Sequence, residues 1–303
     1  QRIKDVELAA RLAFVFTSLY QRVTRLSEFR FWGGSGNTPR YNVPFIFNEA
    51  NVFVTFARKA RTIQDHLLAT AAHYQGQAVV VQQSATHLDS LPDTSVDLIF
   101  TDPPFGANIN YSEMNFLWES WLQRFTETQD EAIVNSVQGK TLQDYQRLMT
   151  QSLSECYRVL RPGYWMLLVF MNSSAQVWEA LRTAISEAGF VIRKADVFDK
   201  QHATFKQLVS ENTAGCELVL HCWKPTMTGE TPTENDDEAV SQREAIFAFL
   251  AGANVEKRRQ AFLHVSRPEE TDFRSLYSEW LIKALTAGEV TLDFAQFRLL
   301  VLE

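Results

Sequence analysis

The sequence is poor in cysteine. Its three cysteines, Cys156, Cys216 and Cys222, are odd in number and widely spaced, and no CxxC pair accompanies them. This pattern excludes a disulfide-stapled scaffold and argues against a zinc knuckle. We therefore predict unpaired, mostly buried thiols in a reducing cytoplasm and no bound metal.

Membrane and secretion signals are also missing. No stretch approaches the roughly 18 to 20 uninterrupted apolar residues of a membrane span. The first residues, QRIKDVELAARLAFVF, scatter charges among the apolar positions, unlike a signal peptide. We predict a soluble, cytoplasmic chain with no membrane partner. Because Gln1 stands in place of an initiator methionine, we also expect further sequence upstream of it.

The charge is acidic on average but unevenly distributed. The net charge is −7 at pH 7, and residues 230–238 (ETPTENDDE) concentrate several of the acids. An acidic average therefore does not exclude a local basic groove for nucleic acid. With 303 residues and 46% hydrophobic content, the chain can bury a large core, as one large domain or as a domain with an appendage.

Residues 1–76 are predicted to form helices joined by a linker. Apolar positions recur at spacings of three and four over 1–27, which predicts one long amphipathic helix. Glycines and prolines punctuate 28–48, and a helical pattern resumes over 49–74.

Residues 77–225 alternate between strand and helix patterns and predict an α/β domain. The short apolar strands favour a sheet that is buried on both faces. Thr141 and Asp144 are predicted to cap a helix that Arg161-Pro162-Gly163 ends. The predicted strands are 78–83, 96–100, 164–170, 190–198 and 216–223, of which the last two can pair antiparallel, and a further helix covers 174–188. An acidic linker, 226–237, and a helical C-terminal extension, 238–303, follow.

The motif that carries chemistry is Asp102-Pro103-Pro104-Phe105, just beyond the end of the predicted strand 96–100. Ligands of open α/β sheets bind at the carboxyl ends of the strands. Two prolines hold the backbone stiff and lack N–H donors, so carbonyl oxygens and the Asp102 carboxylate can converge as acceptors. Such an acceptor-only cluster suits a planar amino group, and Phe105 offers a face for a flat heterocycle. We therefore predict a site for the exocyclic amine of a nucleobase.

These residues resemble the D/N/S-P-P-F/Y signature of the amino-methyltransferases that use S-adenosylmethionine to methylate adenine N6 or cytosine N4 in DNA. The resemblance spans about residues 77–225. The Asn110-Tyr111-Ser112-Glu113 segment, with Trp118 and Trp121 after it, and Thr204-Phe205-Lys206-Gln207 look like further elements of one subtype. The resemblance implies a Rossmann-like methyltransferase sheet and a prokaryotic type of enzyme, such as those of restriction and modification.

The resemblance also implies roles for individual residues. Asp102 and the Pro103 carbonyl, in the rigid frame of Pro104, would orient and polarise the amine, and Phe105 would stack on a base flipped out of the duplex. Ser84, Ala85 and Thr86 stand where the family has Gly-Asp-Ala near the cofactor's adenine, and Asp102 would also face the cofactor. The remaining candidates for contact with the nucleic acid are Asn108, Tyr111, Thr204 and Lys206.

Structural interpretations of the same residues stay open. The diproline motif can be a rigid turn with Asp102 capping the next helix, and Phe105 can pack in the core. Tyr111 can be a helix-surface residue, Trp118 and Trp121 are expected in the core, and a solvated loop is the alternative for Thr204 and Lys206.

The glycine-rich cofactor loop of the family is missing in its expected form. Its one candidate, Phe31-Trp32-Gly33-Gly34-Ser35-Gly36-Asn37, is followed by Pro39 and Pro44 instead of a helix start, which favours a linker or a substrate-facing loop. The chain is thus expected to lack the first strands of the methyltransferase sheet. Upstream residues or a second chain would supply the cofactor half, or methyl transfer has been lost.

The sequence favours a DNA adenine-N6 methyltransferase, because aspartate at the first position of the motif is commoner in that branch. An RNA guanine-N2 or DNA cytosine-N4 methyltransferase is the enzymatic alternative. A non-catalytic subunit of a split methyltransferase is the alternative from a different class.

Overall fold

The structure is a computed structural model that describes residues 4–29, 35–36, 43–71, 77–198, 217–226, 268–288 and 292–302. The chain divides into two compact units. The helical unit comprises Gln1–Gln82 and Asn110–Glu127, and the sheet unit comprises Gln83–Ile109 and Thr128–Glu303. This division differs from the predicted one, because residues 110–127 group with the N-terminal helices and the C-terminal helices group with the sheet.

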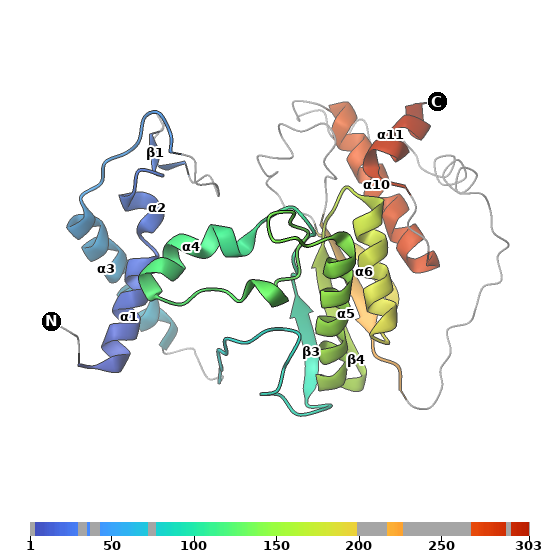
Figure 1. The fold of residues 1–303 in the computed structure, drawn as a ribbon, viewed down its shortest axis with the longest axis horizontal. Coiled ribbons are helices and arrows are strands. Elements are labelled where there is room, and N and C mark those ends of the chain that lie inside the picture. The colour runs from blue at the N-terminus through green and yellow to red at the C-terminus, as the bar shows by residue number, and fades with distance from the viewer. Residues whose placement is uncertain are drawn as a thin grey trace. The chain divides into compact units, whose positions relative to one another are not determined.

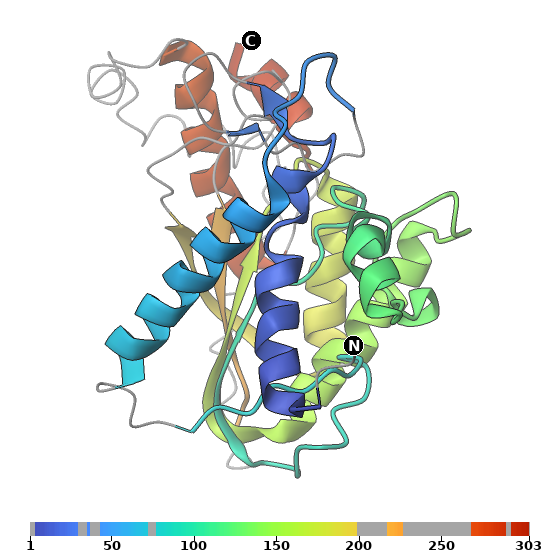
Figure 2. The same ribbon diagram turned by 90° about the vertical axis from the view of Figure 1, so that its left-hand side faces the viewer.

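The described part of the helical unit contains four helices and one short hairpin. These are α1 (Val6–Thr17), α2 (Tyr20–Val23), β1 (Glu28–Phe29), β2 (Ser35–Gly36), α3 (Val52–Ala71) and α4 (Tyr111–Leu122). Figure 2 shows α1 and α3 packed side by side. The helix predicted over 49–74 is confirmed as α3.

The single helix predicted over 1–27 is wrong, because the chain leaves the α-helix after Thr17. The Thr17 hydroxyl donates to the Phe14 carbonyl at 3.1 Å, and the Ser18 hydroxyl donates to the Val15 carbonyl at 2.7 Å. The chain continues in a short second helix, α2, so the periodicity predicted helical residues but not the break between the two helices.

The strand predicted over 78–83 is also wrong. Residues 77–84 form no strand, and Val79, Val80 and Val81 are exposed by 86%, 97% and 52%. A strand exists through hydrogen bonds to a neighbour, and β-branched side chains favour it only where they can pack. No described strand pairs with this segment.

The sheet unit, as far as its residues are described, is built on four strands in the order β3-β4-β6-β5. The strands are β3 (Val96–Thr101), β4 (Leu160–Phe170), β5 (Val191–Phe198) and β6 (Glu217–Trp223). β3 and β4 are parallel, and β6 lies antiparallel between β4 and β5. The carboxyl ends of β3, β4 and β5 therefore share one edge of the sheet. This arrangement confirms the predicted α/β fold and the antiparallel pairing of the last two strands.

Two helices, α5 (Leu142–Val159) and α6 (Ala175–Glu187), cover one face of this sheet (Figure 1). The predicted capping box is present: the Thr141 side chain accepts from the Asp144 N–H, and Asp144 accepts from the Thr141 N–H. The predicted break at 161–163 lies too late, since β4 begins at Leu160 directly after α5. Buried Lys224 donates to the carbonyls of Tyr157 and Leu160, so it satisfies acceptors at this helix end.

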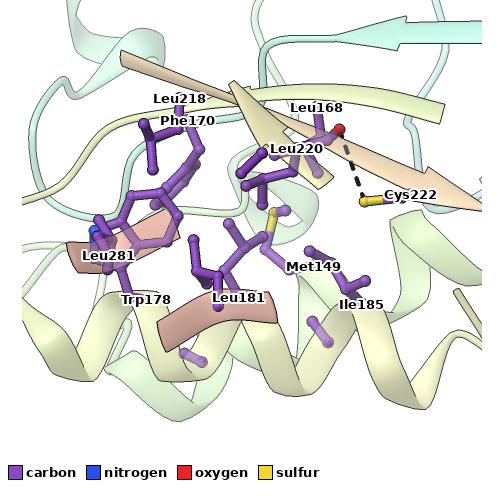
Figure 3. Close-up of a cluster of buried hydrophobic side chains, with 14 of the residues drawn as sticks. Met149, Leu168, Phe170, Trp178, Leu181, Ile185, Leu218, Leu220, Cys222 and Leu281 are labelled. Carbon is purple, nitrogen blue, oxygen red and sulfur yellow. Dashed lines mark hydrogen bonds between the residues drawn. The ribbon is translucent and has the colours of Figure 1, made fainter. Parts of the chain in front are cut away.

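The core lies between the sheet and these helices. Figure 3 shows Trp178, Leu181 and Ile185 of α6 pointing toward Leu168 and Leu220 of the strands. Each of these side chains is at most 1% exposed. Burying such apolar surface is the main source of stability in a domain of this size.

The C-terminal helices belong to the same core. They are α10 (Pro268–Ala287) and α11 (Phe294–Leu302), so the described part of the predicted C-terminal extension is helical. Tyr277, Leu281 and Phe297 join the buried cluster, and the Phe294 N–H donates to the Ser173 carbonyl at 3.2 Å. The predicted extension thus packs on the sheet instead of standing apart. The helix expected after residue 238 and most of the acidic linker lie outside the described residues.

Strand β3 departs from the prediction of a sheet buried on both faces. Leu98 and Phe100 project to the same face and are exposed by 57% and 64%. Within the described residues β3 pairs with β4 alone, so its other edge is open. The reason is that an apolar run forms a buried strand only where a neighbouring element packs on its side chains.

The described cysteines are free thiols. Burial raises the pKa of the Cys222 thiol to about 12 and that of Cys156 to about 11. Cys216 lies outside the described residues. In the described parts of the chain, no group of three or more His, Cys, Asp or Glu side chains could hold a metal ion. None of the helices described there combines the length and apolar character needed to cross a bilayer.

Candidate functional site

The diproline corner, defined as residues 102–106, lies directly after β3. β4 is parallel to β3, so Asp102 and the residues that follow Phe170 meet at the same edge of the sheet. Asp102 is exposed, while Pro103, Pro104 and Phe105 are partly buried. The corner is therefore accessible to a ligand and still anchored in the protein.

Three consecutive carbonyls of the corner are held by donors from three different elements. The Tyr145 hydroxyl of α5 donates to the Pro104 carbonyl at 2.8 Å. The Asn172 side-chain amide, just after β4, donates to the Phe105 carbonyl at 2.9 Å. The Val134 N–H donates to the Gly106 carbonyl at 3.2 Å.

The Pro103 carbonyl differs from these three. No described residue donates a hydrogen bond to it. A carbonyl that accepts from no described donor keeps its lone pairs for water or a ligand. This is the carbonyl that the sequence assigned to the target amine.

Phe105 packs on the core through its ring. Its ring centroid lies 5.0 Å from that of Phe170, with an interplanar angle of 72°, and Phe170 in turn contacts Trp178 edge-on. The structure thus supports the core contact that the sequence left open as an alternative. Phe105 remains partly exposed, so stacking on a base stays a prediction.

Gly106 closes the corner in a conformation that suits glycine. Its φ is +71°, and a Cβ there would lie 3.2 Å from Cγ1 of Val177. The left-handed backbone and the close side chain both disfavour a larger residue. The backbone at the end of the corner is therefore restricted, as its carbonyls are by their hydrogen bonds.

The segment predicted to lie near the cofactor's adenine is held by its own hydroxyls. The Ser84 and Thr86 hydroxyl oxygens are 2.7 Å apart, and the Thr86 hydroxyl lies 2.8 Å from Nδ1 of His87. Thr86 is buried and Ala85 is exposed. None of residues 84–86 is acidic, so this segment presents no carboxylate.

Glu155 and Arg158 of α5 pin the end of this segment to the helix. The Leu88 N–H donates to Glu155 at 2.8 Å, and Arg158 donates to the Leu88 carbonyl at 3.0 Å. The Arg158 hydrogen bond, followed by the one from Leu88, lowers the pKa of the Glu155 carboxyl to about 2. These contacts fix residues 84–88 at the start of the sheet unit.

We expect Glu155→Gln to remove part of the acid sensitivity of the fold. A carboxyl whose folded pKa is depressed adds stability above its unfolded pKa, and this contribution is lost as the pH falls through the folded pKa. For Glu155 the window runs from the ordinary value of 4.5 down to about 2. Denaturation of both proteins between these pH values should give a flatter stability profile for the variant. Equal slopes would show that Glu155 is not tightly paired in solution.

Described residues do not complete a site for S-adenosylmethionine. The described residues contain no glycine-rich turn between a strand and a helix. Of the candidate loop, only Ser35 and Gly36 are described, and they form β2, paired with β1 instead of leading into a helix. This agrees with its assignment as a linker or substrate-facing loop. Residues 84–86 can serve one end of such a cofactor at most.

The other predicted contact residues have different positions. Asn108 is exposed and belongs to the sheet unit, whereas Tyr111 is the first residue of α4 in the helical unit and is 37% exposed. Thr204 and Lys206 lie outside the described residues.

The two tryptophans of α4 do not share one environment. The Trp118 indole N–H donates to the Thr17 carbonyl at 2.8 Å, and its ring packs edge-on against Tyr20. Trp121 is 70% exposed, so its predicted place in the core is wrong. In the helical unit, a cavity of about 610 Å³ is lined by Thr17, Gln82, Asn115, Trp118, Glu119, Leu122 and Arg124. It includes no residue of the diproline corner.

Tyr145 and Asn172 are the site residues that the sequence missed. Tyr145 appeared in the pattern only as one of several buried positions on the predicted helix. Asn172 is a polar residue directly beyond the carboxyl end of a buried strand, and that position is a usable signal. The pairing of either with the diproline corner has no local signature.

The comparisons with known proteins bear on the family of the chain. A family model described as a DNA methylase, of the N6 and N4 type, matches residues 96–280, which is more than half of the chain. None of the curated proteins matches it.

Several solved structures are similar at low identity. A protein of Thermus thermophilus described as a DNA modification methylase is 16% identical, with a TM-score of 0.30 and coverage of 59% of this chain and 70% of that one. A SAM-dependent methyltransferase of Methanosarcina mazei is 13% identical, with a TM-score of 0.26 and coverage of 53% and 77%. The cytosine-N4-specific PvuII DNA methyltransferase is 12% identical, with a TM-score of 0.33 and coverage of 73% and 89%. At these scores the likenesses add nothing to the family match.

Proposed function

The chain belongs to the DNA methylase family of the N6 and N4 type, and we propose that within this family it methylates adenine N6. The matched family model is that of a DNA methylase, and the resemblance of the diproline motif implies a Rossmann-like fold and S-adenosylmethionine as the methyl donor. The observation that carries the proposal is the diproline corner, whose Pro103 carbonyl has no donor among the described residues and whose Asp102 is exposed beside it.

Asp102 and the Pro103 carbonyl would act on the amino group together. An exocyclic amine has two N–H bonds, and the corner offers a carboxylate and a carbonyl oxygen to receive them. Accepting both hydrogens withdraws them from the plane of the base and raises the electron density on nitrogen. The diproline backbone holds both acceptors before the base arrives, so no reorganisation is needed at the moment of reaction.

The target base must leave the duplex to reach this corner, because the amine is paired inside the helix. Base extrusion costs a few kcal/mol, which contacts to the flipped base and to the phosphates offset. In this proposal Phe105 stacks on the base. Asn108, Tyr111, Thr204 and Lys206 contact the DNA around it.

The first residue of the motif favours adenine over cytosine. In the family that this motif resembles, aspartate is commoner in adenine-N6 enzymes and serine in cytosine-N4 enzymes. The experiment is methyl incorporation from radiolabelled S-adenosylmethionine into duplexes, followed by nucleoside analysis. We expect N6-methyladenine; N4-methylcytosine would reassign the base, and label in transfer RNA alone would favour guanine N2.

A second chain or an upstream segment would complete the cofactor site. This part of the proposal is supported by three observations: the edge of β3 that pairs with no described strand, the exposed Leu98 and Phe100 on one face of β3, and the incomplete cofactor site among the described residues. Isothermal titration of S-adenosylmethionine provides the test. We expect S-adenosylmethionine to bind weakly or not at all to residues 1–303 alone. We expect it to bind once the second chain or the upstream segment is added. Absence of binding in every assembly would favour a non-catalytic subunit.

A further inference from the structure

The structure places Tyr145 and Asn172 against the backbone of the corner, and we propose that both are positioning residues for methyl transfer. They touch neither the base nor the cofactor in this proposal. They fix the direction of the Pro103 carbonyl by holding the two carbonyls that follow it. The inference rests on the proposed function of the corner, and it adds two residues that the motif does not contain.

The stiffness of the diproline backbone transmits this effect. Both proline rings fix φ near −65°, and a residue that precedes proline is confined to extended ψ values. Asp102 and Pro103 each precede a proline, so both are restricted in this way. Once the Pro104 carbonyl is anchored by Tyr145, little freedom remains in the direction of the Pro103 carbonyl. Without that bond the corner could rotate as one rigid piece.

Each anchor is itself rigid. The Tyr145 side chain is fully buried at 0% exposure and lies in the first turn of α5, behind the capping box. Asn172 is 7% exposed, and its Oδ1 accepts from the Ser174 N–H at 2.8 Å. The Asn172 carbonyl accepts from the indole N–H of Trp178 at 2.9 Å. The hydrogen bonds therefore connect the corner to both helices that cover the sheet.

The Asn172 side-chain amide can donate to the Phe105 carbonyl in only one of its two orientations. With Oδ1 bound to a backbone N–H, its Nδ2 atom is left to donate, and it donates to Phe105. Replacement by aspartate keeps the acceptor for Ser174 and removes the donor to Phe105. Asn172→Asp therefore places an acceptor opposite the Phe105 carbonyl and breaks the contact to the corner.

A matched control exists elsewhere in the sheet unit. Tyr277 is also 0% exposed, and its hydroxyl donates to the backbone carbonyl of Leu292 at 3.1 Å. Tyr145→Phe and Tyr277→Phe therefore delete the same group from the same kind of bond. Only Tyr145→Phe loosens the corner.

The first measurement is hydrogen exchange of the full chain without DNA or cofactor, read on the peptide that covers 132–140. We expect the Val134 amide, which donates to the Gly106 carbonyl, to exchange about tenfold faster in Tyr145→Phe and Asn172→Asp, as loss of one net hydrogen bond gives. Tyr277→Phe should match the wild type on this peptide. Equal exchange in Tyr145→Phe and Tyr277→Phe overturns the inference, whether or not the protein is active.

The second measurement is single-turnover methylation by the assembly in which the second chain or the upstream segment completes the cofactor site. A small misplacement of reacting groups costs up to about 100-fold in rate, so we expect Tyr145→Phe and Asn172→Asp to slow transfer by about 10- to 100-fold. Affinity for the duplex should stay unchanged, and Tyr277→Phe should keep the wild-type rate. Wild-type rates in both corner variants would refute the positioning role alone. An inactive wild-type assembly would instead count against the proposed function.

Discussion

Asp102→Ala should abolish methyl transfer and leave the fold intact. The carboxylate is one of the two acceptors proposed for the amine, and deleting one preorganised polar contact to a developing charge costs about 100- to 1000-fold in rate. Asp102 is exposed, so its removal opens no cavity in the core. Single-turnover methylation and thermal denaturation measure the two effects separately.

Two further variants make this result specific. Asp97 lies on the same strand and forms an exposed ion pair with Arg161, so Asp97→Ala should leave the rate unchanged. Asp102→Asn keeps one carbonyl oxygen as an acceptor, and we expect it to lose less activity than Asp102→Ala. If Asp102→Ala retained the wild-type rate, the diproline corner would have no part in the mechanism.

Trp178→Ala should lower the free energy of unfolding by about 3 to 5 kcal/mol. The side chain is 1% exposed and packs edge-on against Phe170 in the centre of the core. The change leaves a large cavity and also removes the donor to the Asn172 carbonyl. Urea denaturation, followed by circular dichroism, gives the difference from the midpoint and slope.

Trp165 provides the control for this loss. It lies on β4 in the same unit but is 39% exposed, so Trp165→Ala removes less buried surface. We expect a smaller loss of stability than for Trp178→Ala. Similar losses at both positions would show that Trp178 does not lie at the centre of the core.

Trp178 also connects stability with the site. Trp178→Phe retains an aromatic ring but leaves the Asn172 carbonyl without its indole donor. The same chain of contacts continues from Asn172 to the Phe105 carbonyl, so core packing and corner geometry are coupled. Substitutions in this core can therefore alter activity before they unfold the protein.

The sequence by itself determined the features that depend on neighbouring residues. The capping box at Thr141 and Asp144, the helical periodicity of α3, α5 and α6, and the rigidity of Pro103 and Pro104 are all local. Local hydrogen bonds and fixed dihedral angles act wherever the segment lies, so the pattern sufficed. The family resemblance at residues 102–105 is of the same kind and was confirmed by the family match.

Only the tertiary structure decided which segments meet. Tyr145 lies 41 residues from Pro104, and Asn172 lies 67 residues from Phe105, so neither contact has a signature in sequence. The same reason explains why residues 78–83 form no strand and why Leu98 and Phe100 are exposed. Pairing and burial depend on the neighbour that is present in space, and the sequence of one segment does not contain that neighbour.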